Sequence, residues 1–209
     1  MAGSGLVFLG YVALHAYGNL MVFGGADQFN DYAHHLRTFG EPMLPYGGLL
    51  WVVRVALIVS LVVHAYAAFT LWSRANSARS TRYAVKKAAA SSLASRTMRY
   101  GGIALLLFVI FHILHLTTHT ITPQGDQPTP YQNVVESFQI WWVVLIYVLA
   151  VGALAMHLFH GVWSASQTLG LTSSAAARQR AKLAGHAVGG VIAVAFLLPP
   201  LAILFGIVD

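Results

Sequence analysis

The sequence has 209 residues, of which 57% are hydrophobic and only 9% are charged. This composition, with a positive mean hydropathy, excludes a water-soluble domain and indicates an integral membrane protein. The net charge of +6 comes from residues in short loops beside apolar segments, which favours contact with anionic lipid and argues against nucleic-acid binding.

The first half of the chain contains two apolar segments, each near the roughly 20 residues that a helix needs to cross a bilayer. The first, 6–23, lacks the basic start and the cleavage site of a signal peptide, so we expect it to be a retained helix. The loop at 26–46 contains a predicted amphipathic helix over 27–39, and the second apolar segment is 49–72. Residues 73–100 are rich in Ser, Ala, Arg and Lys, which predicts a helical extension and a polar connector on which a soluble partner could dock.

The second half contains three further segments of this kind, at 101–121, 140–163 and 186–208. Between the first two of these, the loop 122–131 holds three prolines and is expected to be irregular. We therefore predict an all-α integral membrane protein with five transmembrane helices in one transmembrane domain, 1–209.

Basic residues gather on one side of these five helices. Ten of the twelve lie in the loops after the second and fourth segments: Arg74, Arg79, Arg82, Lys86, Lys87, Arg96, Arg99, Arg178, Arg180 and Lys182. The acidic residues fall on the other side. The positive-inside rule then predicts a multi-pass protein of the inner or cytoplasmic membrane, with its N-terminus in the cytoplasm and its C-terminus outside.

Histidines are the chemically informative residues of the apolar segments. They occur on the first four: His15, His64, His112, His115, His119, His157 and His160. An ionisable group inside a membrane is costly, so its presence indicates a partner or a function. The absence of cysteine excludes iron–sulfur clusters, covalent haem and thiolate sites, whereas four helices with one imidazole each suit two bis-histidine haems.

Depth in the membrane sorts these histidines into pairs. At roughly 1.5 Å per residue, His15 and His112 lie at similar depths, and His64 and His157 form a second pair nearer the cytoplasm. If the first four helices form an up-down bundle around two b-type haems, each pair joins diagonal helices. His112, His115 and His119 are spaced to share one helical face, so His115 stays an alternative to His112.

Short motifs around these histidines resemble a known family. They are His15-Ala-Tyr-Gly-Asn19, Ala26-Asp-Gln-Phe-Asn30, His64-Ala-Tyr66, Arg99-Tyr-Gly-Gly102 with nine apolar residues before His112, and the tract from His157 to Gly170. Together they are similar to the cytochrome b membrane anchor of succinate dehydrogenase or fumarate reductase, respiratory complex II. The resemblance is to the single-chain, five-helix, di-haem type and covers nearly the whole chain.

The resemblance implies two haem b cofactors, with His15 and His112 as iron ligands of a distal haem and His64 and His157 as ligands of a proximal haem. It implies that the chain relays electrons between a cytoplasmic iron–sulfur subunit and membrane quinone, expected to be menaquinone, in an enzyme of the tricarboxylic acid cycle. A flavoprotein would be the other partner and would do the carbon chemistry, and no catalytic residue is assigned to this chain. A higher oligomer of the complex is left open.

Other polar residues are candidates for supporting roles. Arg54 would either extend to the membrane interface or pair with a haem propionate, and the chemistry leaves both open. Four further residues are candidates for the surroundings of the haems or their propionates: Asn19, Ser60, His119 and His160. Three are candidates for a quinone site: Trp163, Ser164 and, on the outer side, Glu41.

Two other functions fit the same histidines. A di-haem cytochrome b subunit of a hydrogenase or a formate dehydrogenase would bind the same cofactor with a different partner. A haem-free membrane transporter or assembly protein would use polar histidines along a pathway and would show no visible absorption.

Overall fold

The computed structural model describes residues 1–77 and 93–209, and every regular element in these ranges is a helix. The elements are α1 (Ala2–Leu20), the 3-10 turn η1 (Met21–Gly24), α2 (Gly25–Thr38), α3 (Gly48–Ser77), α4 (Leu93–Leu116), α5 (Pro130–Phe138), α6 (Trp141–Thr168) and α7 (Ala175–Leu204). The predicted all-α class is confirmed for the described residues.

Five of these segments are long and apolar enough to cross a membrane, as predicted: the one that begins with α1, then α3, α4, α6 and α7. One predicted boundary was wrong in a way that matters for the site. α4 ends at Leu116, because the N–H groups of Thr117 and Thr118 both turn back to the carbonyl of Ile113. His119 follows in a left-handed conformation with φ 53° and therefore does not share a helical face with the preceding histidines.

Two short helices lie at one end of the molecule. The predicted amphipathic helix is confirmed as α2, whereas α5 was not predicted. The sequence nevertheless contains the signals for the start of α5. The Thr129 side chain caps the helix by accepting a hydrogen bond from the Gln132 N–H, and Pro130 occupies the first turn. The predicted extension of the second segment is present as far as Ser77, and the connector 78–92, with four of the ten basic residues, lies outside the described residues.

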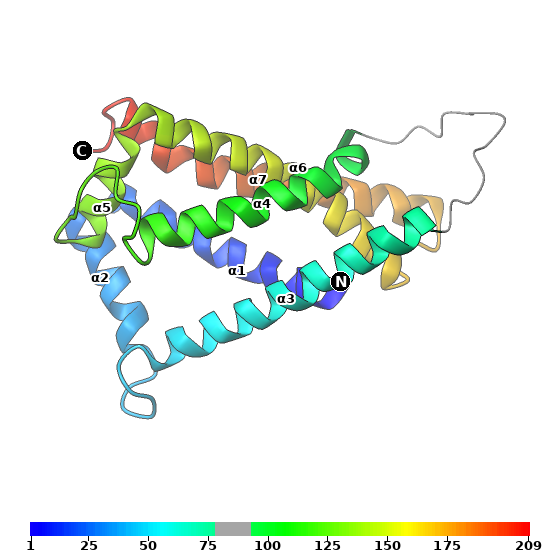
Figure 1. The fold of residues 1–209 in the computed structure, drawn as a ribbon, viewed down its shortest axis with the longest axis horizontal. Coiled ribbons are helices and arrows are strands. Elements are labelled where there is room, and N and C mark those ends of the chain that lie inside the picture. The colour runs from blue at the N-terminus through cyan, green and yellow to red at the C-terminus, as the bar shows by residue number, and fades with distance from the viewer. Residues whose placement is uncertain (78–92) are drawn as a thin grey trace.

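The helices pack side by side so that two pairs of helices face each other across the bundle (Figure 1). α6 and α7 run side by side and form the most extensive helix contact, α4 packs along α6, and α1 contacts both α6 and α7. α3 is outermost, and its main contacts are with α1 and α2. α1 and α3 approach each other near the N-terminus, the amino-terminal end of the bundle, and separate toward the opposite end, the α2–α5 end (Figure 1). α1 therefore lies across from α4, and α3 lies across from α6.

The buried core sits at the α2–α5 end. Its fully buried members come from η1, α5, α6 and α7: Val22, Tyr131, Val135, Phe138, Val143, Val144, Tyr147 and Ile203. Elsewhere many large apolar side chains are exposed, as expected where lipid rather than protein covers a helix. The protein is thus most tightly packed around one end of the bundle.

Two glycines explain the close contact of α6 and α7. A Cβ added at Gly185 would lie 2.7 Å from the carbonyl oxygen of Phe159, and one added at Gly189 would lie 2.8 Å from that of Ala155. Because apolar attraction between helices is weak in lipid, such small residues spaced four apart let two backbones gain close packing instead. The two glycines thus let α6, which carries His157 and His160, pack closely against α7.

We expect Gly189→Ala to destabilise the protein, because its new methyl group would overlap the α6 backbone. Overpacking of this kind costs about 1–3 kcal/mol. The measurement is the thermal unfolding midpoint in detergent. Gly190→Ala is the matched control, since a Cβ there meets nothing within 4 Å, and equal midpoints for the two variants would contradict this account of the α6–α7 contact.

Candidate functional site

Four histidines from four helices meet in two pairs across the diagonals of the bundle. The ring centroids of His15 on α1 and His112 on α4 are 5.8 Å apart, with an angle of 76° between the ring planes. Those of His64 on α3 and His157 on α6 are 6.1 Å apart, with an angle of 52°. The helix packing therefore brings together the same couples that the depths in the sequence predicted.

The two pairs lie at different levels of the bundle. Gly5 of α1 lies beside the ring of His64, and Gly102 of α4 lies beside the ring of His157. Gly5 precedes His15 on α1 by ten residues, and Gly102 precedes His112 on α4 by ten residues. Ten residues correspond to roughly 15 Å along a helix axis. The His64–His157 pair is therefore the one nearer the amino-terminal end, and the His15–His112 pair is nearer the α2–α5 end.

Glycine keeps space open beside the His64–His157 pair. A Cβ added at Gly5 would lie 3.7 Å from Cε1 of His64, and a Cβ added at Gly102 would lie at the same distance from Cε1 of His157. The same spacing of a glycine and a histidine thus recurs on α1 and α4 with the same role. Larger side chains at these positions would fill the space around the rings.

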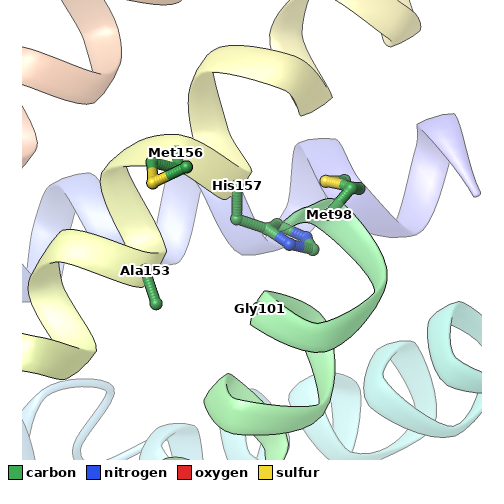
Figure 2. A pocket seen from close by; sticks show the side chains of 5 residues that line it. All are labelled: Met98, Gly101, Ala153, Met156 and His157. Atoms are coloured by element: carbon green, nitrogen blue, oxygen red, sulfur yellow. The ribbon is translucent and has the colours of Figure 1, made fainter. Parts of the chain in front are cut away.

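A small apolar hollow adjoins this pair. It is about 90 Å³ in volume and is lined by Met98 and Gly101 of α4 and by Ala153, Met156 and His157 of α6. Figure 2 shows the His157 ring extending from α6 toward the turn of α4 that carries Met98 and Gly101. The His157 Nδ1 atom is buried and has no hydrogen-bond partner among the described residues.

Hydrogen bonds engage one nitrogen in each of two other rings. Nδ1 of His112 lies 3.1 Å from the hydroxyl of Tyr147, and Nδ1 of His64 lies 3.3 Å from Oγ of Ser4. Within the described residues, Nε2 of the His112 ring makes no hydrogen bond. A ring held at Nδ1 presents Nε2 to a metal, which is how most ligating histidines are oriented.

His115 differs from its neighbour on α4. It is fully buried, and both of its nitrogens are engaged, Nδ1 with the Tyr147 hydroxyl at 3.1 Å and Nε2 with Gln124 Oε1 at 3.3 Å. His119 is exposed beyond the end of α4. The structure therefore brings the His112 ring to His15, whereas the His115 ring lies between Tyr147 and Gln124 with both nitrogens hydrogen-bonded.

The pairs suit an iron that needs only two protein ligands. With metal–nitrogen bonds of about 2 Å, two imidazoles on opposite sides of one iron have ring centroids roughly 6 Å apart. No group of three or more His, Cys, Asp or Glu side chains with metal-site geometry occurs in the described ranges. A bare transition metal would need such a group, whereas haem iron takes its other four ligands from the porphyrin.

The predicted supporting residues are spread along the bundle. Asn19 donates from Nδ2 to the backbone carbonyl of His15 at 2.7 Å, so its amide is committed to its own helix. The guanidinium carbon of Arg54 lies 5.0 Å from the centroid of the Trp51 ring on the same helix, a cation–π contact. Ser60 and His160 are half-buried on α3 and α6.

The quinone candidates lie at opposite ends. Trp163 and Ser164 are half-buried near the end of α6, where the ammonium of Lys182 on α7 lies 5.3 Å from the Trp163 ring. Glu41 is exposed in the loop between α2 and α3. These three residues therefore do not form one site.

Several residues of the site were missed from the sequence. Tyr147 and Gln124 contact histidine rings, and Ser4 and Gly5 flank the His64–His157 pair; Gly102, beside His157, had been noted only as part of a motif. The repeated ten-residue spacing of glycine and histidine on the first and third segments was a usable signal. The role of Tyr147 had none, because it depends on how α4 and α6 pack.

Comparison with known families places the site in context. Residues 72–199 match the family model described as succinate dehydrogenase/fumarate reductase transmembrane subunit. The match includes His112 and His157, one member of each pair, and leaves out His15 and His64. Comparisons with curated proteins and with solved structures found no match. Because the matched segment is more than half of the chain and contains α4, α6 and most of α7, the protein belongs to the family of transmembrane subunits of succinate dehydrogenase and fumarate reductase.

Proposed function

We propose that the chain is a di-haem cytochrome b anchor that relays electrons between a soluble iron–sulfur subunit and membrane quinone. The observation that carries the proposal is the meeting of four histidines in two couples at two levels of one bundle. His15 with His112 and His64 with His157 would each hold one haem, and haem held by two histidines would supply one-electron transfer rather than oxygen binding.

Different residues of the chain are proposed to hold the two haems. His15 and His112 are the proposed ligands of the distal haem, and His64 and His157 those of the proximal haem. Gly5 and Gly102 would leave room for the proximal macrocycle.

The partners follow from the family. Its members are subunits of succinate dehydrogenase or fumarate reductase, which implies association with the flavoprotein and the iron–sulfur subunit. We propose that these dock at the amino-terminal end, on the cytoplasmic face. Described basic residues near helix ends there support this orientation by the positive-inside rule: Arg74, Arg99, Arg178, Arg180 and Lys182.

Quinone, proposed to be menaquinone, would bind near the proximal haem and the iron–sulfur partner. Trp163 and Ser164 are the proposed lining, because they lie at that end and are not fully buried. Glu41 remains the candidate for protonating a quinone at the other end, and its exposure would give it direct access to water.

Haem content tests the ligand assignment. We expect His64→Ala and His112→Ala each to lose one of two haems, because one imidazole cannot hold the iron in place of two. A pyridine-haemochrome assay on the purified complex measures this. His186→Ala is the control, since that ring is exposed and bonded to its own helix at Lys182, and retention of both haems in either ligand variant would refute the assignment.

The space beside the proximal pair can be tested separately. Gly5→Val should lower the haem content toward one per chain, because its side chain would enter the space next to His64. Gly3→Val is the matched control on the same helix, where an added Cβ meets nothing within 4 Å. Equal haem content in the two variants would show that Gly5 does not border the macrocycle.

Copurification tests the partner. The affinity-tagged chain, extracted from its native membrane in mild detergent, should bring with it a subunit that contains covalent flavin. Nickel or molybdenum in the purified complex would instead indicate a hydrogenase or formate dehydrogenase anchor. A reduced-minus-oxidised spectrum without any haem band would overturn the proposal in favour of a haem-free protein.

A further inference from the structure

A continuous chain of side-chain hydrogen bonds runs from α5 to the proposed distal ligand. The amide nitrogen of Gln124 donates to Asn133 Oδ1 at 2.5 Å, and Gln124 Oε1 lies 3.3 Å from Nε2 of His115. Nδ1 of His115 and Nδ1 of His112 each lie 3.1 Å from the hydroxyl of Tyr147. One hydroxyl thus joins the two histidines of α4.

The chemistry of these groups gives the chain a direction. Once Gln124 donates from its nitrogen to Asn133, its Oε1 can only accept, so His115 must donate from Nε2–H. A neutral imidazole with its proton on Nε2 has a lone pair on Nδ1, which accepts the proton of the Tyr147 hydroxyl. The Tyr147 oxygen then accepts from Nδ1–H of His112. Every donor in the sequence is matched to one acceptor.

We propose that this chain, the Tyr147 relay, fixes the neutral tautomer of His112 whose lone pair lies on Nε2, the atom that binds iron. The inference rests on the proposed function, because it concerns the distal haem held by His112 and His15. Tyr147, His115 and Gln124 are then positioning residues, since none of them touches iron and each acts through His112.

The opposite direction has a different result. If both amides were reversed, each link would reverse with them, and the Tyr147 hydroxyl would donate to Nδ1 of His112. Nε2 of His112 would then carry a proton and could not bind a metal. Iron ligation therefore requires the first direction, in which the ring has the correct tautomer when haem arrives.

The surroundings keep the relay intact. Aromatic rings meet the Tyr147 ring edge to face or at a steep tilt: those of Phe108, Phe111 and Phe138, with centroids 5.0, 6.3 and 4.9 Å away. His115 is fully buried among these residues. Because water has little access, it does not compete for the hydrogen bonds, and each one is stronger than at a surface.

The far end of the relay is anchored by the short helix α5. Asn133 is almost fully buried on this helix, which is fixed to α2 by the hydrogen bond from the Tyr131 N–H to Asn30 Oδ1 at 3.1 Å. The backbone carbonyl of Gln124 accepts from Gln127 Nε2 at 3.1 Å, which holds the loop before α5. The α2–α5 end is thereby connected to the distal ligand.

A hydrogen bond accepted from Nδ1–H makes an imidazole a stronger electron donor to iron and so favours the ferric state. We therefore expect Tyr147→Phe to raise the midpoint potential of one haem of the purified complex and to shift its low-spin ferric EPR signal. The haem affected should be the one that is lost in His112→Ala, and the other haem serves as an internal reference.

Tyr131→Phe is the matched control. Tyr131 and Tyr147 are equally buried, at 7% exposure, and belong to the same core, but the Tyr131 hydroxyl donates to the backbone carbonyl of Asp209, outside the relay. Both potentials should be unchanged in this variant. Gln124→Leu cuts the relay two links from His112, and we expect a smaller upward shift of the same haem.

The results of these experiments distinguish failure of the Tyr147 relay from failure of the proposed function. Two haems with unchanged potentials in Tyr147→Phe would overturn the relay and leave the proposed function standing. A shift in Tyr147→Phe with none in Gln124→Leu would also overturn it, because Tyr147 would then act alone. Absence of haem from the unaltered complex would instead refute the proposed function.

Discussion

Four imidazoles must be kept in the apolar interior of a membrane, where an unsatisfied polar group is costly. The bundle meets this constraint by facing them across its two diagonals, so that the rings of His15 and His112 meet at one level and those of His64 and His157 at another. The close α6–α7 contact and the glycines beside the rings serve the same constraint. They set how near the backbones come and how much room is left.

The two levels differ in their surroundings. The level nearer the α2–α5 end lies next to the buried core and the Tyr147 relay, so its polar atoms are shielded and directionally bonded. The level nearer the amino-terminal end lies beside a hollow, and His157 Nδ1 has no partner among the described residues.

Much of this could be predicted from the sequence because the bilayer restricts the choices. Helix number followed from apolar length, and the couples followed from depth, since both depend on a fixed rise per residue. The predictions were wrong where a few hydrogen bonds decide the end or the start of a helix. The end of α4 depends on the backbone turn at Thr117, which moved His119 off the helix, and α5 was overlooked although Thr129 and Pro130 mark its start.

The sequence by itself determined the class of protein, the five apolar helices and the four histidines on which a haem site would depend, because composition and one-dimensional spacing carry that information. The resemblance favoured His112 over His115 as a ligand, and the tertiary structure adds that the two rings have different neighbours. The two residues lie three apart on one helix, and both rings contact the Tyr147 hydroxyl. They differ because the His112 ring meets His15 of α1, whereas Nε2 of His115 is engaged by Gln124 in the loop after α4. Contacts between segments far apart in the chain are made by packing, which no local pattern encodes.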